Sequence, residues 1–237
     1  PNSISSFDEI YVEYSFSKNY VSITIPQIYD GEMQQYSTVI RELRTMQERV
    51  YTIATGFEYR DCNIVSTQVT DEGKYSLLYK KRGRENRRSK EEFYWLTPSF
   101  KPSKAKQHFI NPYKYLKSAK IYYHPQTKKS QLLALFNFGL KGGSQGIAIY
   151  NEDFPEESLN NPFQDNVITR VQGASALSKN KTVDNLFIRY AMPHLNGSYL
   201  VVLEKYYVSK EMERFFAVAK VDPKIGSTVL SARSINI

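Results

Sequence analysis

Short runs of alternating apolar and polar residues recur along the whole chain and limit what it can fold into. Residues 10–16 and 20–25 are examples, rich in Val, Ile, Thr and Tyr. A period of two places alternate side chains on opposite faces of a β-strand. Polar turn residues separate the runs, so the pattern predicts an all-β protein. Further runs cover 64–69, 75–79, 121–123, 132–138, 147–150, 186–190, 199–203 and 215–221.

These runs fall into about four similar sets. Each set has a polar-leading strand, a tight polar turn, an apolar strand and, after a variable loop, another strand. The turns contain Asn19, Gly73, Lys129 and Gly197, which are 54, 56 and 68 residues apart. Because a propeller blade contains four short antiparallel strands, this recurrence predicts a propeller-like fold. A β-sandwich or barrel is the alternative, since it also has strands every ~8–12 residues.

We expect one β-rich domain over residues 1–237, because no linker divides the chain cleanly. Its repeats lie near 8–56, 62–100, 114–157 and 184–237. Two proline-containing segments, Pro98–Pro112 and Glu152–Gln164, are expected to be long surface loops between the sets.

One segment has a different period. Between Tyr36 and Ile53, apolar residues recur every three or four positions, as on one face of a helix. The interpretation of residues 37–49 therefore stays open between helix and strand. The residues of this stripe are Val39, Leu43, Met46, Val50 and Ile53.

A glycine-rich run, Gly139–Gly146, follows one predicted strand and precedes another. A phosphate-binding loop needs a helix after the glycines, because the helix N-terminus supplies the amides and the dipole. We therefore interpret this run as the turn of a β-hairpin.

The residue counts exclude several kinds of site. A single cysteine, Cys62, forms no internal disulfide, and the three histidines lie far apart, so we predict no metal and no cofactor. The longest apolar runs are five residues, such as 132–136. A membrane-spanning helix needs about 20, so we predict no transmembrane span.

Positive charge is concentrated in one region. The chain has 32 Lys and Arg against 24 Asp and Glu, a net charge of +8. Residues 80–129 contain 15 Lys or Arg and three acids, a local net of +12, so the rest of the chain is net acidic. Such asymmetry favours encounters with anionic partners.

The basic run at residues 80–90 holds seven cations and one acid, and aromatic residues follow it. Cations that track an anionic chain beside stacking aromatic rings are typical of polyanion-binding sites. We therefore predict that this segment binds an anionic polymer, a lipid headgroup or a protein partner. The alternative is a solvated loop, with the aromatic residues in the core. The candidate residues are Lys81, Arg82, Arg84, Arg87, Arg88 and Trp95.

No catalytic set can be assembled from motifs. There is no Gly-x-Ser-x-Gly elbow, and adjacent acids on a strand point to opposite faces. Glu204 follows an apolar strand, and we expect it to face inward and pair with a nearby cation. The prediction is a non-enzymatic protein. The alternative is a carbohydrate-binding or carbohydrate-active protein, with Trp95 as an aromatic platform and Glu204 as the carboxylate.

The segment 194–207 combines a polar turn, a glycine, an apolar strand and Glu-Lys-Tyr-Tyr. It resembles the blade motif of uncharacterised exported propeller-like proteins of Bacteroidota, and residues 146–153 resemble the strand that closes the preceding blade. The resemblance covers mainly the C-terminal half. It implies export to the periplasm or the outer-membrane surface, with a lipid anchor as one form of attachment. It also implies a binding or accessory role with a protein partner in the cell envelope.

Overall fold

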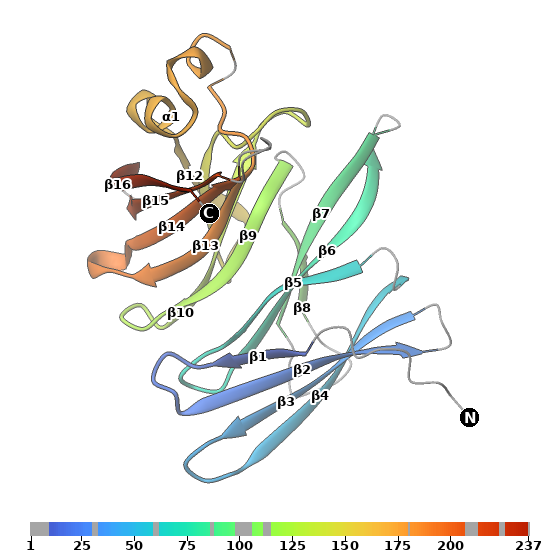
Figure 1. The fold of residues 1–237 in the computed structure, drawn as a ribbon. Coiled ribbons are helices and arrows are strands. Elements are labelled where there is room, and N and C mark those ends of the chain that lie inside the picture. The colour runs from blue at the N-terminus through green and yellow to red at the C-terminus, as the bar shows by residue number, and fades with distance from the viewer. Residues whose placement is uncertain are drawn as a thin grey trace. The chain divides into compact units, whose positions relative to one another are not determined.

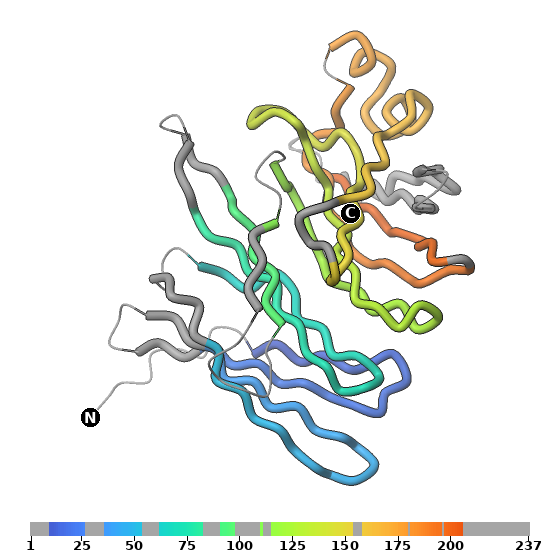
Figure 2. Tube along the Cα trace, turned by 180° about the vertical axis from the view of Figure 1, so that it is seen from behind, coloured from blue at the N-terminus to red at the C-terminus, as the bar shows by residue number. Residues whose placement is uncertain are grey.

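Four antiparallel sheets contain nearly all of the regular structure in the described residues (Figure 1). The computed structural model describes residues 10–29, 33–58, 62–85, 88–97, 106–110, 115–179, 181–206, 213–222 and 226–236. Each sheet is a meander of four strands that follow one another in the chain, so the trace turns back at every connection (Figure 2). The predicted all-β, propeller-like fold is confirmed. The barrel alternative is wrong for the described strands, because they form four separate sheets.

The chain divides into two compact units, Pro1–Ile110 and Asn111–Ile237, and each is described by itself. The single domain predicted over residues 1–237 stays a prediction. Sheet 1 and sheet 2 belong to the first unit. Sheet 1 consists of β1 (Tyr11–Tyr14), β2 (Tyr20–Tyr29), β3 (Met33–Glu42) and β4 (Glu48–Glu58). Sheet 2 consists of β5 (Cys62–Val69), β6 (Tyr75–Glu85), β7 (Arg88–Thr97) and β8 (Lys106–Phe109).

The second unit contains sheet 3, sheet 4 and one helix, α1 (Asp165–Gln172). Two short 3-10 turns lie at Ala174–Ala176 and Leu195–Gly197. Sheet 3 consists of β9 (Tyr115–His124), β10 (Lys129–Asn137), β11 (Gly146–Asn151) and β12 (Phe154–Pro162). Sheet 4 consists of β13 (Leu186–Pro193), β14 (Tyr199–Tyr206), β15 (Glu213–Asp222) and β16 (Gly226–Asn236).

The turn between the first and second strands of every sheet contains a residue with positive φ. These residues are Lys18, Gly73, Lys128 and Gly197, with φ from 52° to 75°. They lie at, or next to, the four turn positions from which the sequence repeat was inferred. In the first of these turns the Ser15 hydroxyl accepts hydrogen bonds from the backbone amides of residues 19 and 20. The repeat in the sequence therefore corresponds to a repeated turn geometry.

Three of the first strands also carry a β-bulge. In β5, β9 and β13 one extra residue stands against the second strand, at Val65, Lys117 and Arg189. A bulge places two successive residues opposite one, which bends the strand and redirects a side chain. This recurrence is a second feature that the sheets share.

Sheets 1 and 2 pack through one face each to form the core of the first unit. Tyr36, Ile40 and Ile53 from sheet 1 cluster with apolar side chains of β5, β6 and β7. Within this layer the Tyr75 hydroxyl lies 2.6 Å from Thr24 Oγ1, which lies 3.1 Å from Thr38 Oγ1. Hydrogen bonding among these buried hydroxyls satisfies polar groups that would otherwise destabilise the core.

Sheets 3 and 4 and α1 share the core of the second unit. Apolar side chains of β10 and β11 pack with those of β13 and β14, and three buried residues of α1 join them. The amine of Lys205 is buried with them and donates a hydrogen bond to the carbonyl oxygen of Val171, 3.1 Å away, and another to the side chain of Gln172. Burial lowers the pKa of this lysine, and nearby Asp184 partly offsets the shift. These bonds fasten the end of α1 to sheet 4.

The segment with the helical stripe is a β-hairpin, so the helix alternative for residues 37–49 is wrong. It forms the end of β3, a turn and the start of β4, and Met46 in the turn has φ of 59°. Tyr36, Thr38 and Ile40 alternate inward, while Val39 lies on the other face. Tertiary pairing with β2 therefore overrides the local period.

Other expectations of irregular structure are also corrected. β8 and β12 lie inside the two segments expected to be loops, because each pairs with the strand before it. The sequence analysis assigned no structure to α1. The glycine-rich run does connect two antiparallel strands, β10 and β11, which confirms the hairpin prediction.

Gly143 and Gly139 provide a matched test of this hairpin. A Cβ at Gly143 would lie 2.2 Å from the Val183 carbonyl oxygen, whereas one at Gly139 would meet nothing closer than 3.5 Å. We expect Gly143→Ala to lower the free energy of unfolding by about 2–3 kcal/mol through overpacking against backbone. Gly139→Ala should change it little. Urea unfolding followed by circular dichroism measures both, and equal stability of the two variants would contradict this packing.

The buried tyrosines make alkaline stability a test of the core. Burial raises the pKa of Tyr75 to about 12, with its hydrogen bonds to threonine acting in the opposite direction. The unfolded chain releases this proton near pH 10, so raising the pH above 10 favours unfolding. By pH 11 the loss from Tyr75 should reach about 1.4 kcal/mol. Tyr75→Phe should therefore flatten the fall in unfolding free energy between pH 9 and 11, and parallel curves would disprove it.

Candidate functional site

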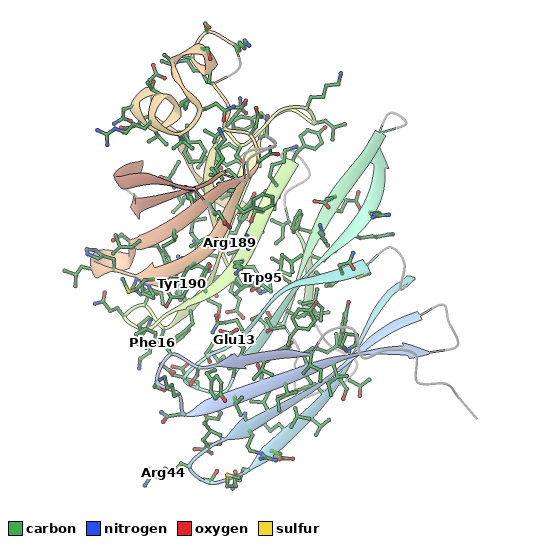
Figure 3. The ribbon with its side chains drawn as sticks, viewed as in Figure 1. Glu13, Phe16, Arg44, Trp95, Arg189 and Tyr190 are labelled. Atoms are coloured by element: carbon green, nitrogen blue, oxygen red, sulfur yellow. The ribbon has the colours of Figure 1, made fainter. Side chains whose placement is uncertain are left out.

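The bulge in β13 presents two successive side chains on the same side of sheet 4. Ile188 pairs with Leu203 and Tyr190 pairs with Val202, so Arg189 is the extra residue. Ile188 and Leu203 are buried in the core of the second unit. Arg189 and Tyr190 are both exposed, on the face directed away from that core (Figure 3). Without the bulge, alternation would direct one of them inward.

An ion pair lies at this bulge. Arg189 Nε donates to Glu204 Oε2 on the adjacent strand β14. The Glu204 side chain is 2% exposed and that of Arg189 is 48% exposed, so the carboxylate lies under the guanidinium. This confirms the prediction that Glu204 pairs with a cation. The expectation that it faces inward is wrong, because its neighbours Leu203 and Lys205 point to the core and Glu204 is buried on the other face of sheet 4. The guanidinium supports the buried carboxylate, while about half of the Arg189 side chain stays exposed to solvent.

Large apolar side chains surround this pair and remain open to solvent. Tyr190 is 58% exposed, Met192 45% and Phe187 39%. Phe187 stands opposite Glu204 in the ladder, and Met192 follows Tyr190 on the same face. We call this surface the β13 face, and define it as Phe187, Arg189, Tyr190, Met192, Val202 and Glu204.

The β13 face combines two kinds of contact. Exposed aromatic rings offer flat apolar surface at a small entropic cost. Beside them, Arg189 supplies directional hydrogen-bond donors. A clustered set of exposed apolar residues around polar groups is typical of a ligand or partner surface.

Arg87, one of the residues predicted for polyanion binding, lies outside the described residues. The other residues predicted for polyanion binding lie on strands β6 and β7 rather than in a loop: Lys81, Arg82, Arg84, Arg88 and Trp95. The side chains of Arg84 and Arg88 also lie outside the described residues. Lys81 stands opposite Glu92 in the ladder, and Arg82 stands opposite Glu91. Acids that face cations across a strand pair offset their charge locally.

One further cation of these two strands is directly paired. Lys80 Nζ lies 2.6 Å from Glu91 Oε1.

The predicted aromatic platform, Trp95, is 1% exposed, so its ring is not available for stacking on a ligand. Trp95 belongs to the first unit and Glu204 to the second. The structure therefore associates Glu204 with Arg189 and Tyr190, which the sequence analysis did not select.

A signal for these missed residues exists in the sequence. The run from Phe187 to Met192 has polar and aromatic residues at consecutive positions, which breaks strict alternation. Such a break marks a bulge only when the partner strand is known. For that reason the sequence alone did not place Arg189 and Tyr190 on one face.

Comparison with known proteins finds some similarity in structure but none in sequence. No protein-family model matches the chain, and no curated protein matches its sequence. Solved structures with some similarity include an apocarotenoid oxygenase from Synechocystis, at 8% identity and a TM-score of 0.47 over 97% of this chain and 53% of that one. An endo-arabinase from Bacteroides thetaiotaomicron has 12% identity and a TM-score of 0.45 over 90% of this chain and 74% of that one. A hypothetical protein from Leishmania major has 11% identity and a TM-score of 0.38 over 98% and 70%.

All three identities are 12% or lower, and all three TM-scores are below 0.5. This chain spans about half the length of the oxygenase chain. Two of the three structures are nevertheless enzymes. The prediction that the protein is non-enzymatic is therefore wrong: it rested on the lack of motifs, and the solved structures with some similarity to this chain include an oxygenase and an endo-arabinase.

The described residues contain neither a membrane-spanning helix nor a metal-binding cluster. Among them, no helix has the length and apolar character needed to cross a bilayer. In the same part of the chain, His, Cys, Asp and Glu side chains form no cluster of three or more suited to a metal ion.

Replacing Arg189 tests the ion pair. Arg189→Ala leaves the buried Glu204 carboxylate without its guanidinium, so we expect the free energy of unfolding to fall by about 1–3 kcal/mol. Glu204→Gln in that background should recover part of the loss, because the uncompensated charge is removed. Urea titration of the two single variants and the double variant gives the coupling energy. Additive effects would show that the pair does not contribute.

Proposed function

We propose that the β13 face binds carbohydrate, and that the protein is a carbohydrate-binding or carbohydrate-active protein. The observation that carries the proposal is the exposure of Tyr190 and Phe187 beside the Arg189–Glu204 ion pair.

The physical argument starts from the two surfaces of a sugar ring. The axial C–H groups make one side of a pyranose or furanose apolar, while hydroxyl groups surround its edge. Aromatic rings bury such an apolar side, and a tyrosine also offers a polar tip. Arg189 lies next to Tyr190 in the bulge and can donate to hydroxyl oxygens at the edge of the sugar. Both requirements are met on one strand.

The arrangement favours a polymer over a small enclosed ligand. Phe187, Tyr190 and Met192 lie along one strand, and all are at least 39% exposed. A row of exposed side chains on a strand offers an elongated surface, whereas small-molecule sites bury most of the ligand in a cleft. An oligosaccharide or polysaccharide lying across β13 fits this surface.

Hydrolysis at this face would require more than Glu204. Glycosidases commonly use two carboxylates about 5–9 Å apart across the scissile bond. Of the side chains that the structure describes on the β13 face, Glu204 is the carboxylate, and Arg189 occupies it. The described residues therefore support recognition at this face, and a hydrolysis assay on any bound glycan tests for chemistry.

Polyanion binding and export to the cell envelope still rest on the sequence. Polyanion binding through the β6–β7 hairpin stays a prediction, with Glu91 and Glu92 offsetting part of its charge. Export to the cell envelope, a lipid anchor and an envelope protein partner remain proposals that rest on the resemblance of residues 194–207. Fractionation of the native host with an antibody to this protein tests the compartment, and recovery in the cytosol would overturn export.

Tyr190→Ala tests carbohydrate binding at the β13 face. A glycan array and soluble polysaccharides, arabinan among them, identify a ligand, and calorimetry then measures its affinity. Loss of one stacking ring should weaken binding about tenfold or more, since ~1.4 kcal/mol corresponds to a factor of ten. Tyr190→Phe should keep most of the affinity.

Leu159→Ala is the matched control. Leu159 is 45% exposed and lies on β12, outside the β13 face. Its replacement should leave glycan affinity unchanged. Failure of every glycan to bind, or equal affinity of Tyr190→Ala and wild type, would refute the proposal.

A further inference from the structure

The large exposed apolar residues of the first unit gather on sheet 1. Among described side chains of that unit, those on or beside this sheet account for all of the large apolar residues that are exposed. Sheet 1 buries its other face against sheet 2. The exposed set is Ile10, Val12, Tyr14, Phe16, Ile23, Leu43, Met46 and Val50. We propose that this outer face of sheet 1 binds the same face of a second copy of the chain.

A continuous apolar row crosses the middle of this face. Val12 pairs with Ile23, Ile23 with Val39, and Val39 with Val50, so the row includes one residue from each of the four strands. Val12, Ile23 and Val50 are 51%, 37% and 64% exposed. Facing sheets in proteins pack through such rows with their backbones about 10 Å apart. The row therefore has the form of a sheet-packing surface without a second sheet on it.

The exposed area fits the requirement of a dimer. The exposed fractions of the eight apolar residues correspond to roughly 700 Å² of surface, close to the ~800 Å² that each partner contributes to a standard interface. A monomer rarely leaves a contiguous apolar patch of this size exposed to water. Burial by a second copy would remove the whole patch from solvent.

The face is also complementary to itself. Consider a dimer whose two-fold axis runs along the central row. Each residue on one side of the row then faces a residue of the same strand in the other copy, on the opposite side of the row. Val21 would then face Ile25, both on β2. On the β3–β4 side, the Arg41–Glu48 ion pair would face Ser37 and Thr52.

In this arrangement apolar groups meet apolar groups, and a neutral ion pair meets hydroxyl groups. Among the side chains of this face that the structure describes, no like charges are brought together. This match satisfies the condition for an isologous interface, in which one patch binds its own copy.

The β13 face does not offer the same match. The Arg189–Glu204 pair lies between its apolar residues, so stacking two such faces would desolvate charged groups. On sheet 1 the Arg41–Glu48 pair lies at one side, and both of its side chains are at least 40% exposed. The two exposed faces are therefore suited to different partners.

Analytical ultracentrifugation of the full chain tests the proposal. We expect twice the 27.5 kDa chain mass at micromolar concentration. Val12→Glu and Val50→Glu, each at an exposed position of the row, should give monomers with unchanged circular dichroism spectra. Leu159→Glu, at an exposed site outside sheet 1, should remain dimeric. A wild-type monomer at ~100 μM, or dimers of both row variants, would overturn the proposal.

Crosslinking tests the symmetry independently of any loss of folding. A residue on the two-fold axis faces its own counterpart, so Ile23→Cys should be crosslinked to itself by a bismaleimide with a span of about 10 Å. Wild type is the control, because its Cys62 is buried. Leu159→Cys should stay uncrosslinked. Equal crosslinking of Ile23→Cys and Leu159→Cys would contradict the two-fold arrangement.

Discussion

Packing of two sheets through one face each is the constraint on which the rest of each unit depends. In the first unit, sheet 1 and sheet 2 bury apolar rows against each other, and in the second unit sheet 3, sheet 4 and α1 do the same. Because the side-chain period of a strand is two, this packing determines which residues of sheet 1 and sheet 4 point to the other face, where large apolar side chains stay exposed. Both exposed apolar surfaces described above, on sheet 1 and on sheet 4, follow from it.

The β-bulges modify that constraint locally. A regular β13 would alternate between core and solvent and would offer isolated outward residues. The extra residue at Arg189 instead brings a cation and an aromatic ring together beside the Glu204 carboxylate. Bulges also occur in β5 and β9. In β13 the bulge residue, Arg189, in addition forms an ion pair with a buried carboxylate. The local disruption of the ladder is thus the basis of the candidate site.

The two exposed faces differ in composition, and this separates their proposed roles. Sheet 1 presents mainly aliphatic residues, with an ion pair at one side, which suits the dry packing of another sheet. The β13 face presents rings around a charged pair, which suits a ligand with both apolar and hydroxyl surfaces. The two proposed surfaces lie in different units of the chain.

The sequence by itself determined the β class and the recurrent turns, because alternation and turn residues are local signals. Tertiary structure decided the rest. Residues 37–49 form a hairpin because β3 pairs with β2, although their apolar period also suits a helix. Arg189 and Tyr190 share a face, and Trp95 is buried, because register, bulges and sheet packing depend on strands distant in sequence. Those contacts are not encoded in any short segment, and only the folded chain brings them together.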